Sequence, residues 1–469
     1  MTTGQEPYDV AIIGAGLVGC ALARELSAFQ LSVALIEARE DVGDGTSKAN
    51  TAILHTGFDA VPGTLESRLV RRGYQLLSDY AAVTGIPVEH TGAILVAWDA
   101  EQLDALPGLQ AKAVKNGYER TELITAAQVY EALPHLGPGA LGGLTVPDES
   151  ITCTWTTTLA LATEAVQRGT DLRLATRVTG IEVGSETTIL RTTQGDIAAR
   201  WVANAAGLGS DVIDRLFGHE RFTITPRKGE LLVYDKQARP LVDTIVLPVP
   251  SKLGKGVLVS PTVYGNVMVG PTAEDIEDRT DTSTTEKGFA FLLAKAHLLM
   301  PALGHEEVTA TYAGLRAATE HIDYIVEADT EQRYVVAGGI RSTGLTASMA
   351  LAEHLAGLLA EAGLALEPKA HLPAPPRMPN IGEAGVRPYQ DDRRIQDDPE
   401  YGRIICFCER VTAGEIRDAC ASVIPATTLG GLRRRTRAMN GRCQGFFCGA
   451  EVQARLESAS SPEHGTATS

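Results

Sequence analysis

The pattern of apolar and polar residues predicts a β-α-β unit within the first forty positions. Residues 8–13 form a short apolar run that is typical of a buried strand. Residues 17–28 carry apolar side chains at helical spacing, and residues 31–36 form a second apolar run. A strand, a helix and another strand in this order predict a parallel sheet with helices on its faces.

A glycine-rich turn joins the first predicted strand to the helix. Gly14, Gly16 and Gly19 have the spacing G-x-G-x-x-G. We expect Gly14 to make the tight turn, Gly16 to let the backbone approach a pyrophosphate, and Gly19 to allow close helix packing. Glu37 ends the second strand, near the offset at which an acidic side chain binds a ribose hydroxyl. The unit therefore predicts a Rossmann-type dinucleotide site, without distinguishing FAD from NAD.

The middle of the chain has the pattern of a sheet. Strand-like runs separated by turn residues lie at 229–234, 256–260 and 266–270. Few helical signals occur before residues 286–299, so the range of about 215–330 predicts a β-rich domain. Residues 333–337 then predict another strand, which is followed by two glycines and, after Thr346, by a helix.

Composition divides the chain into two units and a connector. Residues 1–365 carry the patterns above, and residues 366–402 are rich in proline without a helical period, which predicts an extended connector that wraps the body. Residues 403–456 hold a cysteine-bearing domain, and residues 457–469 are small and polar, as in a disordered tail. The 469 residues suffice for two or three domains with a buried core.

Charge is unevenly distributed along the chain. The net charge is −16, but residues 400–469 carry nine Lys or Arg against seven Asp or Glu. The acidic body excludes nucleic-acid binding there, since phosphate contacts need a basic face. The exception is a group of five arginines: Arg433, Arg434, Arg435, Arg437 and Arg442. We expect them to form a solvated basic face, to lie beside an anionic metal cluster, or to dock an acidic redox partner.

Four of the seven cysteines form a pattern of their own. Cys406 and Cys408 are one pair, and Cys443 and Cys448 are a second, wider pair. Structural zinc sites use wider pairs than Cys406 and Cys408, whereas iron–sulfur clusters accept more varied spacings. Zinc, isolated thiols and a disulfide remain open alternatives. A disulfide is disfavoured because residues 1–7 lack a secretion signal, which predicts a cytoplasmic chain. The remaining cysteines, expected in the core, are Cys20, Cys153 and Cys420.

The flanking residues carry a specific resemblance. Residues 404–409 (IICFCE), 430–437 (GGLRRRTR) and 441–448 (GRCQGFFC) resemble the 2Fe-2S domain of bacterioferritin-associated ferredoxin, over roughly residues 402–456. The resemblance implies a small helical domain in which the four cysteines hold one 2Fe-2S cluster.

A second resemblance covers approximately residues 8–365. Residues 43–57, 204–207 and 338–346 are similar to the FAD segments of D-amino-acid-oxidase-like flavoproteins. Within that superfamily the chain most resembles the FAD subunit of glycerol-3-phosphate dehydrogenases, and residues 62–65 resemble L-2-hydroxyglutarate dehydrogenase. The resemblance implies FAD contacts at Thr46, Ser47, Val178, Ala206, Gly207, Gly339, Arg341, Ser342, Thr343, Gly344, Leu345 and Thr346. The helix that follows would then direct its N-terminus to the pyrimidine end of the flavin.

Three residues are candidates for catalysis. Arg316 lies in a segment that resembles the family's substrate-clamping one, and its planar guanidinium suits a carboxylate or a phosphate. A base near the flavin must take the hydroxyl proton, and histidine titrates near neutral pH. His55 is the first candidate and His321 the second. In addition, Lys252, Lys255 and Tyr264 are candidate phosphate contacts in the predicted substrate sheet.

These features predict a fold of class α/β: a Rossmann-type FAD domain, a β-rich substrate domain and a C-terminal iron–sulfur domain. The predicted activity is FAD-dependent oxidation of a small anionic hydroxy substrate, foremost glycerol 3-phosphate. The electrons would pass through the cluster to a redox partner protein or to a quinone- or NAD-linked subunit, in a hetero- or homo-oligomer. No membrane-spanning run is present, although peripheral contact stays open. Oxidation of L-2-hydroxyglutarate, an amine or an amino acid is the alternative within this class. An NAD-binding protein with a structural zinc module is the alternative outside it.

Overall fold

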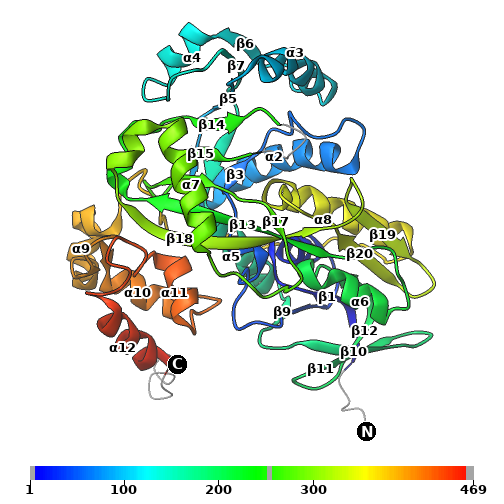
Figure 1. Ribbon diagram of the computed structural model, residues 1–469. Coiled ribbons are helices and arrows are strands. Elements are labelled where there is room, and N and C mark those ends of the chain that lie inside the picture. The colour runs from blue at the N-terminus through cyan, green and yellow to red at the C-terminus, as the bar shows by residue number, and fades with distance from the viewer. Residues whose placement is uncertain (1–5, 251–255, 461–469) are drawn as a thin grey trace.

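Residues 6–250 and 256–460 are described by a computed structural model, in which two large sheets and a small C-terminal unit lie together (Figure 1). The predicted β-α-β unit is present as β1 (Tyr8–Ile13), α1 (Leu17–Leu26) and β2 (Val33–Ile36). The strand β2 begins later than predicted because the Ser32 hydroxyl and backbone N–H both bind the Asp9 carboxylate, at 2.8 Å.

The nucleotide-side sheet has eight strands, and its central strands are parallel. β1 lies between β2 and β12 (Ile197–Asn204), and β12 continues to β20 (Tyr334–Gly338). β9 (Asp171–Arg173), β10 (Val178–Val183), β11 (Thr188–Thr192) and β19 (Ile325–Asp329) complete the sheet. Because parallel strands share an orientation, the glycine turn after β1 and the glycines after β20 lie at one edge, where open α/β sheets bind ligands.

Helices cover this sheet. α1 and α8 (Gly344–Glu361) pack against its strands, α2 (Leu65–Thr84) packs on α8, and α5 (Thr154–Gln167) packs on α1. α6 (Ser210–Leu216) packs on β12 and β20, after the short turn η2 (Gly207–Gly209). A three-stranded sheet of β3 (Ile53–Leu54), β4 (Val88–Glu89) and β8 (Ser150–Thr152) lies beside them, after η1 (Thr46–Lys48). No helix of the described ranges is long and apolar enough to cross a membrane.

The substrate-side sheet has nine strands. As predicted, residues 215–330 supply most of it: β13 (Thr225–Tyr234), β14 (Ile245–Pro248), β15 (Leu258–Pro261), β16 (Val267–Gly270), β17 (Glu274–Asp275) and β18 (Val308–Ala318). The predicted range of the sheet was too narrow, because three earlier strands extend it. β5 (Ala93–Ala97) pairs with β14, β7 (Gly142–Val146) pairs with β5, and β6 (Glu122–Thr125) pairs with β7. Beside these strands lie α3 (Ala100–Lys115), α4 (Ala126–Ala132), α7 (Glu286–Leu299), η3 (Lys236–Leu241) and η4 (Pro301–His305).

The C-terminal unit has its own apolar core, which includes Cys406 and Cys448. It consists of β21 (Ile404–Cys406), β22 (Val411–Thr412), α10 (Ala413–Cys420), α11 (Leu429–Thr436) and α12 (Gly449–Ser460). It lies against the body rather than apart from it (Figure 1). The helix α12 extends through Ser460, so the start of the predicted disordered tail is wrong; residues 461–469 lie outside the described ranges.

The connector runs along the body, as predicted. The backbone N–H of Lys369 donates to Ala28, that of Met378 to Thr84, and that of Glu383 to Val263, at 2.8–2.9 Å. It is not free of helix, because η5 (Pro388–Gln390), α9 (Asp392–Asp397) and η6 (Pro399–Tyr401) occupy its end. These elements are too short to show a period, and the Asp391 side chain caps α9 by accepting the N–H groups of Arg393 and Arg394.

Candidate active site and cysteine cluster

The glycine turn has the geometry that its spacing predicts. Gly14 has φ +104°, and a Cβ on Gly19 would lie 1.8 Å from the Gly14 oxygen, so the helix packs directly on the turn. Gly16 is less constrained by the protein, with the Ser47 hydroxyl at 3.2 Å from its virtual Cβ. The N-cap residue of α1, Gly16, has no side chain to cap the helix, and the Ser47 hydroxyl accepts the backbone N–H of Leu17 at 3.0 Å. The turn therefore offers backbone N–H groups and room to an anion, which fits a dinucleotide pyrophosphate.

Glu37 lies at the end of β2, beside this turn. Its carboxylate accepts the N–H groups of Ala15 and Arg39, at 2.8 and 2.9 Å. Burial raises the pKa of Glu37 despite these hydrogen bonds. A carboxylate has further lone pairs for ribose hydroxyls, so its position fits the predicted role.

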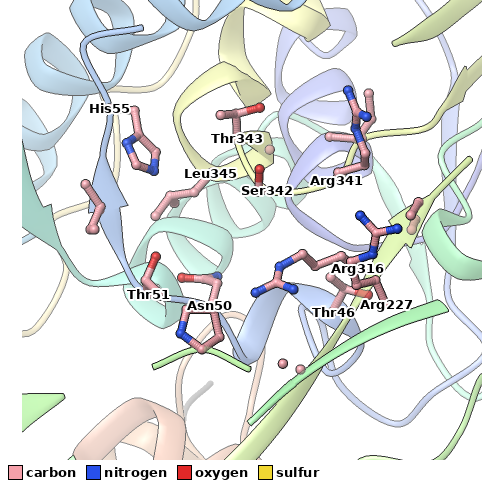
Figure 2. Close-up of a pocket in the computed structure, with 18 of the residues that line it drawn as sticks. Thr46, Asn50, Thr51, His55, Arg227, Arg316, Arg341, Ser342, Thr343 and Leu345 are labelled. Carbon is pink, nitrogen blue, oxygen red and sulfur yellow. The ribbon is translucent and has the colours of Figure 1, made fainter. Parts of the chain in front are cut away.

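A cavity of about 850 Å³ lies between the two large sheets. Figure 2 shows side chains from several separate segments that face it. Of the predicted cofactor residues, those in its wall are Gly16, Thr46, Ser47, Gly207, Gly339, Arg341, Ser342, Thr343, Gly344 and Leu345. Those outside its wall are Gly14, Gly19, Glu37, Val178, Ala206 and Thr346. The volume, a wall that includes both Gly16 and the start of α8, and the N-terminus of α8, which no N-cap side chain satisfies, fit FAD.

Arg316 lies in the cavity wall next to Arg227, its partner across the β13–β18 pair (Figure 2). Arg227 is held by Asp275, with two contacts of 2.6 and 3.0 Å. Arg316 has no hydrogen bond or ion pair to any residue of the described ranges. Burial first, and then the charge of Arg227, lower the pKa of the Arg316 guanidinium. A guanidinium at such a site lacks its counterion, and a bound anion would supply one.

His55 also faces the cavity (Figure 2). Its Nδ1 lies 3.0 Å from the fully buried carboxylate of Glu149, and its backbone N–H donates to Thr346. The other Glu149 oxygen accepts the backbone N–H and the hydroxyl of Thr56, at 2.7 and 2.9 Å. A carboxylate that accepts a hydrogen bond from Nδ1–H holds the ring in the tautomer whose Nε2 carries no proton. Nε2 can then accept a proton, as a general base does.

The other predicted site residues lie elsewhere. His321 is not in the cavity wall, because its ring turns to the backbone oxygen of Arg221 on the surface. Tyr264 is buried away from the cavity, with its hydroxyl 2.9 Å from the Cys153 sulfur, since residues 261–267 turn toward the C-terminal unit. Lys252 and Lys255 lie outside the described ranges. Cys20 and Cys153 are in the core as expected, and Cys420 is half-buried.

Four cysteines meet in the C-terminal unit as two pairs. Cys408 lies within hydrogen-bonding reach of Cys443, and Cys406 within reach of Cys448. Two such cysteine pairs within one small unit suit a centre with two irons and bridging sulfides. Backbone N–H groups, that of Phe447 above all, lower the pKa of the Cys443 thiol, which favours the thiolate that iron binds.

Three phenylalanines border these ligands on the outside. Phe407, Phe446 and Phe447 are 74, 85 and 80% exposed, and each is next to a ligand cysteine or one residue away. Burying such a ring stabilises a protein by about 1.5–3 kcal/mol, so three exposed rings on two neighbouring loops are unusual.

The arginine group does not form the solvated face or the partner-docking surface that were predicted, and its place beside an anionic metal cluster stays a prediction. Arg434 and Arg435 bind the buried Asp41 of the nucleotide domain, at 2.6 and 2.7 Å. Arg437 binds Glu409 within the unit and lies over the ring of Tyr264. These arginines are therefore neither a solvated face nor a free docking surface, because they join the C-terminal unit to the body. Only Arg442 is well exposed, and it pairs with Asp235.

Glu149 and Arg227 were not found from the sequence. Glu149 is far from His55 in the chain, so no spacing relates them. Arg227 could have been found by pairing the strands that contain residues 229–234 and 311–316, since Arg227 then faces Arg316.

Comparison with known proteins gives two family matches. The family model described as FAD dependent oxidoreductase matches residues 9–358, and the BFD-like [2Fe-2S] binding domain matches residues 404–458. A glycerol 3-phosphate dehydrogenase of Caloramator mitchellensis is 35% identical over 95% of this chain and 93% of its own length. An L-2-hydroxyglutarate dehydrogenase of Caenorhabditis elegans is 30% identical over 57% of this chain and 63% of its own.

Among solved structures, the chain is similar to the dithionite-reduced L-alpha-glycerophosphate oxidase of Mycoplasma pneumoniae with FAD bound. The TM-score is 0.76 at 27% identity, over 80% of this chain and all of that one.

Proposed function

Because this chain belongs to the family of FAD dependent oxidoreductases, of the glycerol-3-phosphate dehydrogenase type, and uses FAD and a 2Fe-2S cluster, we propose that its substrate is sn-glycerol 3-phosphate. The product is dihydroxyacetone phosphate, and a redox partner takes the electrons. The observation that carries this proposal is the unpaired Arg316 in the same cavity as the His55–Glu149 pair.

Arg316 and Arg227 form the anion subsite. Arg227 already has Asp275 as its counterion, so the net charge of this part of the wall is positive. A phosphate dianion takes hydrogen bonds from the fork of Arg316 and is attracted by Arg227 beside it. Glycerol lacks this anion, and therefore loses both affinity and position.

His55 is the base. With its Nδ1 proton held by Glu149, its Nε2 takes the proton from the substrate hydroxyl. Glu149, which is fully buried and also bound by Thr56, fixes the ring orientation and stabilises the imidazolium that forms. When bound, FAD would accept the hydride from the substrate carbon, and the cluster would supply single-electron transfer.

Anaerobic bleaching of the flavin by a substrate panel tests the proposal. We expect glycerol 3-phosphate to bleach the flavin quickly, and glycerol, L-2-hydroxyglutarate and amino acids to be slow or inert. Faster bleaching by glycerol would exclude the anion subsite. Faster bleaching by L-2-hydroxyglutarate or an amino acid would keep the subsite for a carboxylate and exclude the phosphorylated substrate.

Arg316→Lys tests the subsite directly. It keeps the charge but removes the two-pronged donor, so we expect kcat/KM to fall by about 10- to 100-fold, or about 1.4–2.7 kcal/mol. Arg191→Lys is the matched control, because Arg191 is a surface residue paired with Glu182 and Asp196, far from the cavity. If both variants match the parent protein, Arg316 does not bind the substrate.

A further inference from the structure

A run of contacts leads from the cavity wall to a cluster ligand. Trp155, in the first turn of α5, donates its Nε1–H to the backbone oxygen of Lys48, at 2.9 Å. Lys48 lies between Ser47 and Ala49, which both line the cavity. The flavin-side wall is thus one hydrogen bond away from an indole ring.

The run continues into the second unit through aromatic contacts. The ring of Trp155 stacks on that of Tyr264, with centroids 5.0 Å apart and an angle of 21° between the planes. The guanidinium carbon of Arg437, from the C-terminal unit, lies 4.2 Å from the centroid of Tyr264. Tyr264 is held from behind by the Cys153 sulfur. The two rings therefore lie between the body and the unit.

The last links end at Cys408. Arg437 binds the Glu409 carboxylate at 2.7 Å, and Glu409 is covalently joined to Cys408. Arg437, Glu409 and Tyr264 are all buried, so little water interrupts the run. Each step from Lys48 to Cys408 is a covalent bond, a hydrogen bond, an ion pair or a ring contact.

We propose that Trp155, Tyr264 and Arg437 form the bridge along which electrons pass from the flavin to the iron–sulfur cluster. The proposal rests on the proposed function, which requires such a transfer. Electron tunnelling is faster through bonded and packed atoms than through water, and this run supplies such a medium. The three residues touch neither the substrate nor the reacting carbon. They act by filling the space between the two cofactor sites with packed atoms.

Substrate oxidation delivers two electrons to the flavin. Each transfer along the bridge moves one electron and no atom. The cluster takes up one electron at a time, and an outside one-electron carrier protein must remove the first before the second arrives. The rings are neither oxidised nor reduced on balance.

The test measures how fast the cluster is reduced after the flavin has been reduced by light and a sacrificial donor. This loading needs no substrate, so failure of the substrate assignment leaves the test valid. Trp155→Leu and Tyr264→Met each remove one ring, and we expect each to slow cluster reduction by about tenfold or more. Trp155→Phe and Tyr264→Phe keep a ring, and should restore a rate near that of the parent protein.

Leu159→Ala is the matched control. Leu159 follows Trp155 on α5 and lines the same small pocket against Arg434 and Arg435, but lies off the run. We expect it to leave the rate of cluster reduction unchanged. Hydrogen exchange of residues 429–442 in protein free of iron and flavin reports the docking of the unit separately.

A parental rate in Trp155→Leu or Tyr264→Met would overturn the proposal. So would equal slowing in Leu159→Ala, because packing rather than the rings would then control the rate. Slowing that coincides with faster hydrogen exchange in residues 429–442 would assign the rings a docking role, and would also overturn it. Slow transfer with unchanged exchange would support it.

Discussion

At the scale of single residues, the buried Glu149 carboxylate lies 3.0 Å from Nδ1 of His55. His55→Asn removes the proposed base, so we expect the rate of flavin reduction by substrate to fall by about 10²- to 10⁴-fold. Stopped-flow absorbance of the flavin measures this rate. Glu149→Gln keeps the size of the side chain but can donate to Nδ1, so it should also slow flavin reduction while substrate affinity changes little.

The rates of flavin reduction in His55→Asn and Glu149→Gln show together whether His55 accepts the proton. If His55→Asn reduces the flavin as fast as the parent protein, another group takes the proton. His321 is the residue to examine then, although its ring faces the surface.

Two glycines of the same turn should respond differently to substitution. Gly16→Val meets only the Ser47 hydroxyl within the protein, so we expect a folded protein that has lost FAD, because the side chain fills the space of the pyrophosphate. Gly19→Ala meets backbone at 1.8 Å and should unfold the domain or lower its melting temperature sharply. Flavin content and circular dichroism distinguish the two. Full flavin occupancy in Gly16→Val would show that the pyrophosphate binds elsewhere.

At the scale of elements, α11 docks on the loop after β2 through Asp41. Burial alone would raise the pKa of Asp41, but Arg435 and Arg434 hold it below the ordinary value of 3.8. Asp41→Asn leaves the buried Arg435 without a carboxylate, while Arg434 keeps Asp44 at 2.7 Å. We therefore expect a loss of about 3 kcal/mol from the docking of the C-terminal unit. Hydrogen exchange of residues 429–436 measures this loss.

The pH dependence of that loss has a definite sign. Because the folded-state pKa of Asp41 is lowered, its contribution is fully present above pH 3.8 and disappears as the pH falls through the folded-state value. The difference between Asp41→Asn and the parent protein should therefore be constant near neutral pH and shrink below about pH 4. A difference that grows on acidification would contradict the ion pair.

Elements differ in how far the sequence predicts them. The β-α-β unit, α7 and the strands of the substrate sheet follow from local patterns, since each has a regular run or spacing of apolar residues. The strands β5, β6 and β7 were missed as part of that sheet because they join it through the pairing of β5 with β14, which is distant in the chain. For the same reason the Asp41 pairs and the Trp155–Tyr264 stack have no sequence signal.

At the scale of the molecule, two redox centres share one chain but rest on separate residues. Cys443→Ser removes one cluster ligand, so we expect loss of the electron-paramagnetic signal of the reduced cluster, with flavin reduction by substrate nearly unchanged. The electron-paramagnetic signal and the iron content of anaerobically purified protein measure the loss of the cluster. Flavin bleaching by substrate measures flavin reduction. Stoichiometric zinc without iron in the parent protein would contradict the cluster.

The two cofactors were predictable because each has a local pattern: glycines at fixed spacing for one and paired cysteines for the other. The position of the iron–sulfur unit relative to the flavin site could not be predicted. The arginines that suggested an outside partner bind the body of the same chain instead. Charge counted along a sequence does not say which carboxylates lie opposite.

The pinned connector limits how the C-terminal unit can move. Backbone hydrogen bonds fix it at Lys369, Met378 and Glu383, and the fully buried Arg387 holds its end against Glu415. Because little of the connector is free, the C-terminal unit stays at high effective concentration near its docking site on the body. After a transient release it rebinds sooner than it can diffuse away. This pinning argues against a swinging carrier that visits a distant partner. The redox partner proposed above would then have to come to the enzyme, where Phe407, Phe446 and Phe447 are exposed beside the cysteine pairs.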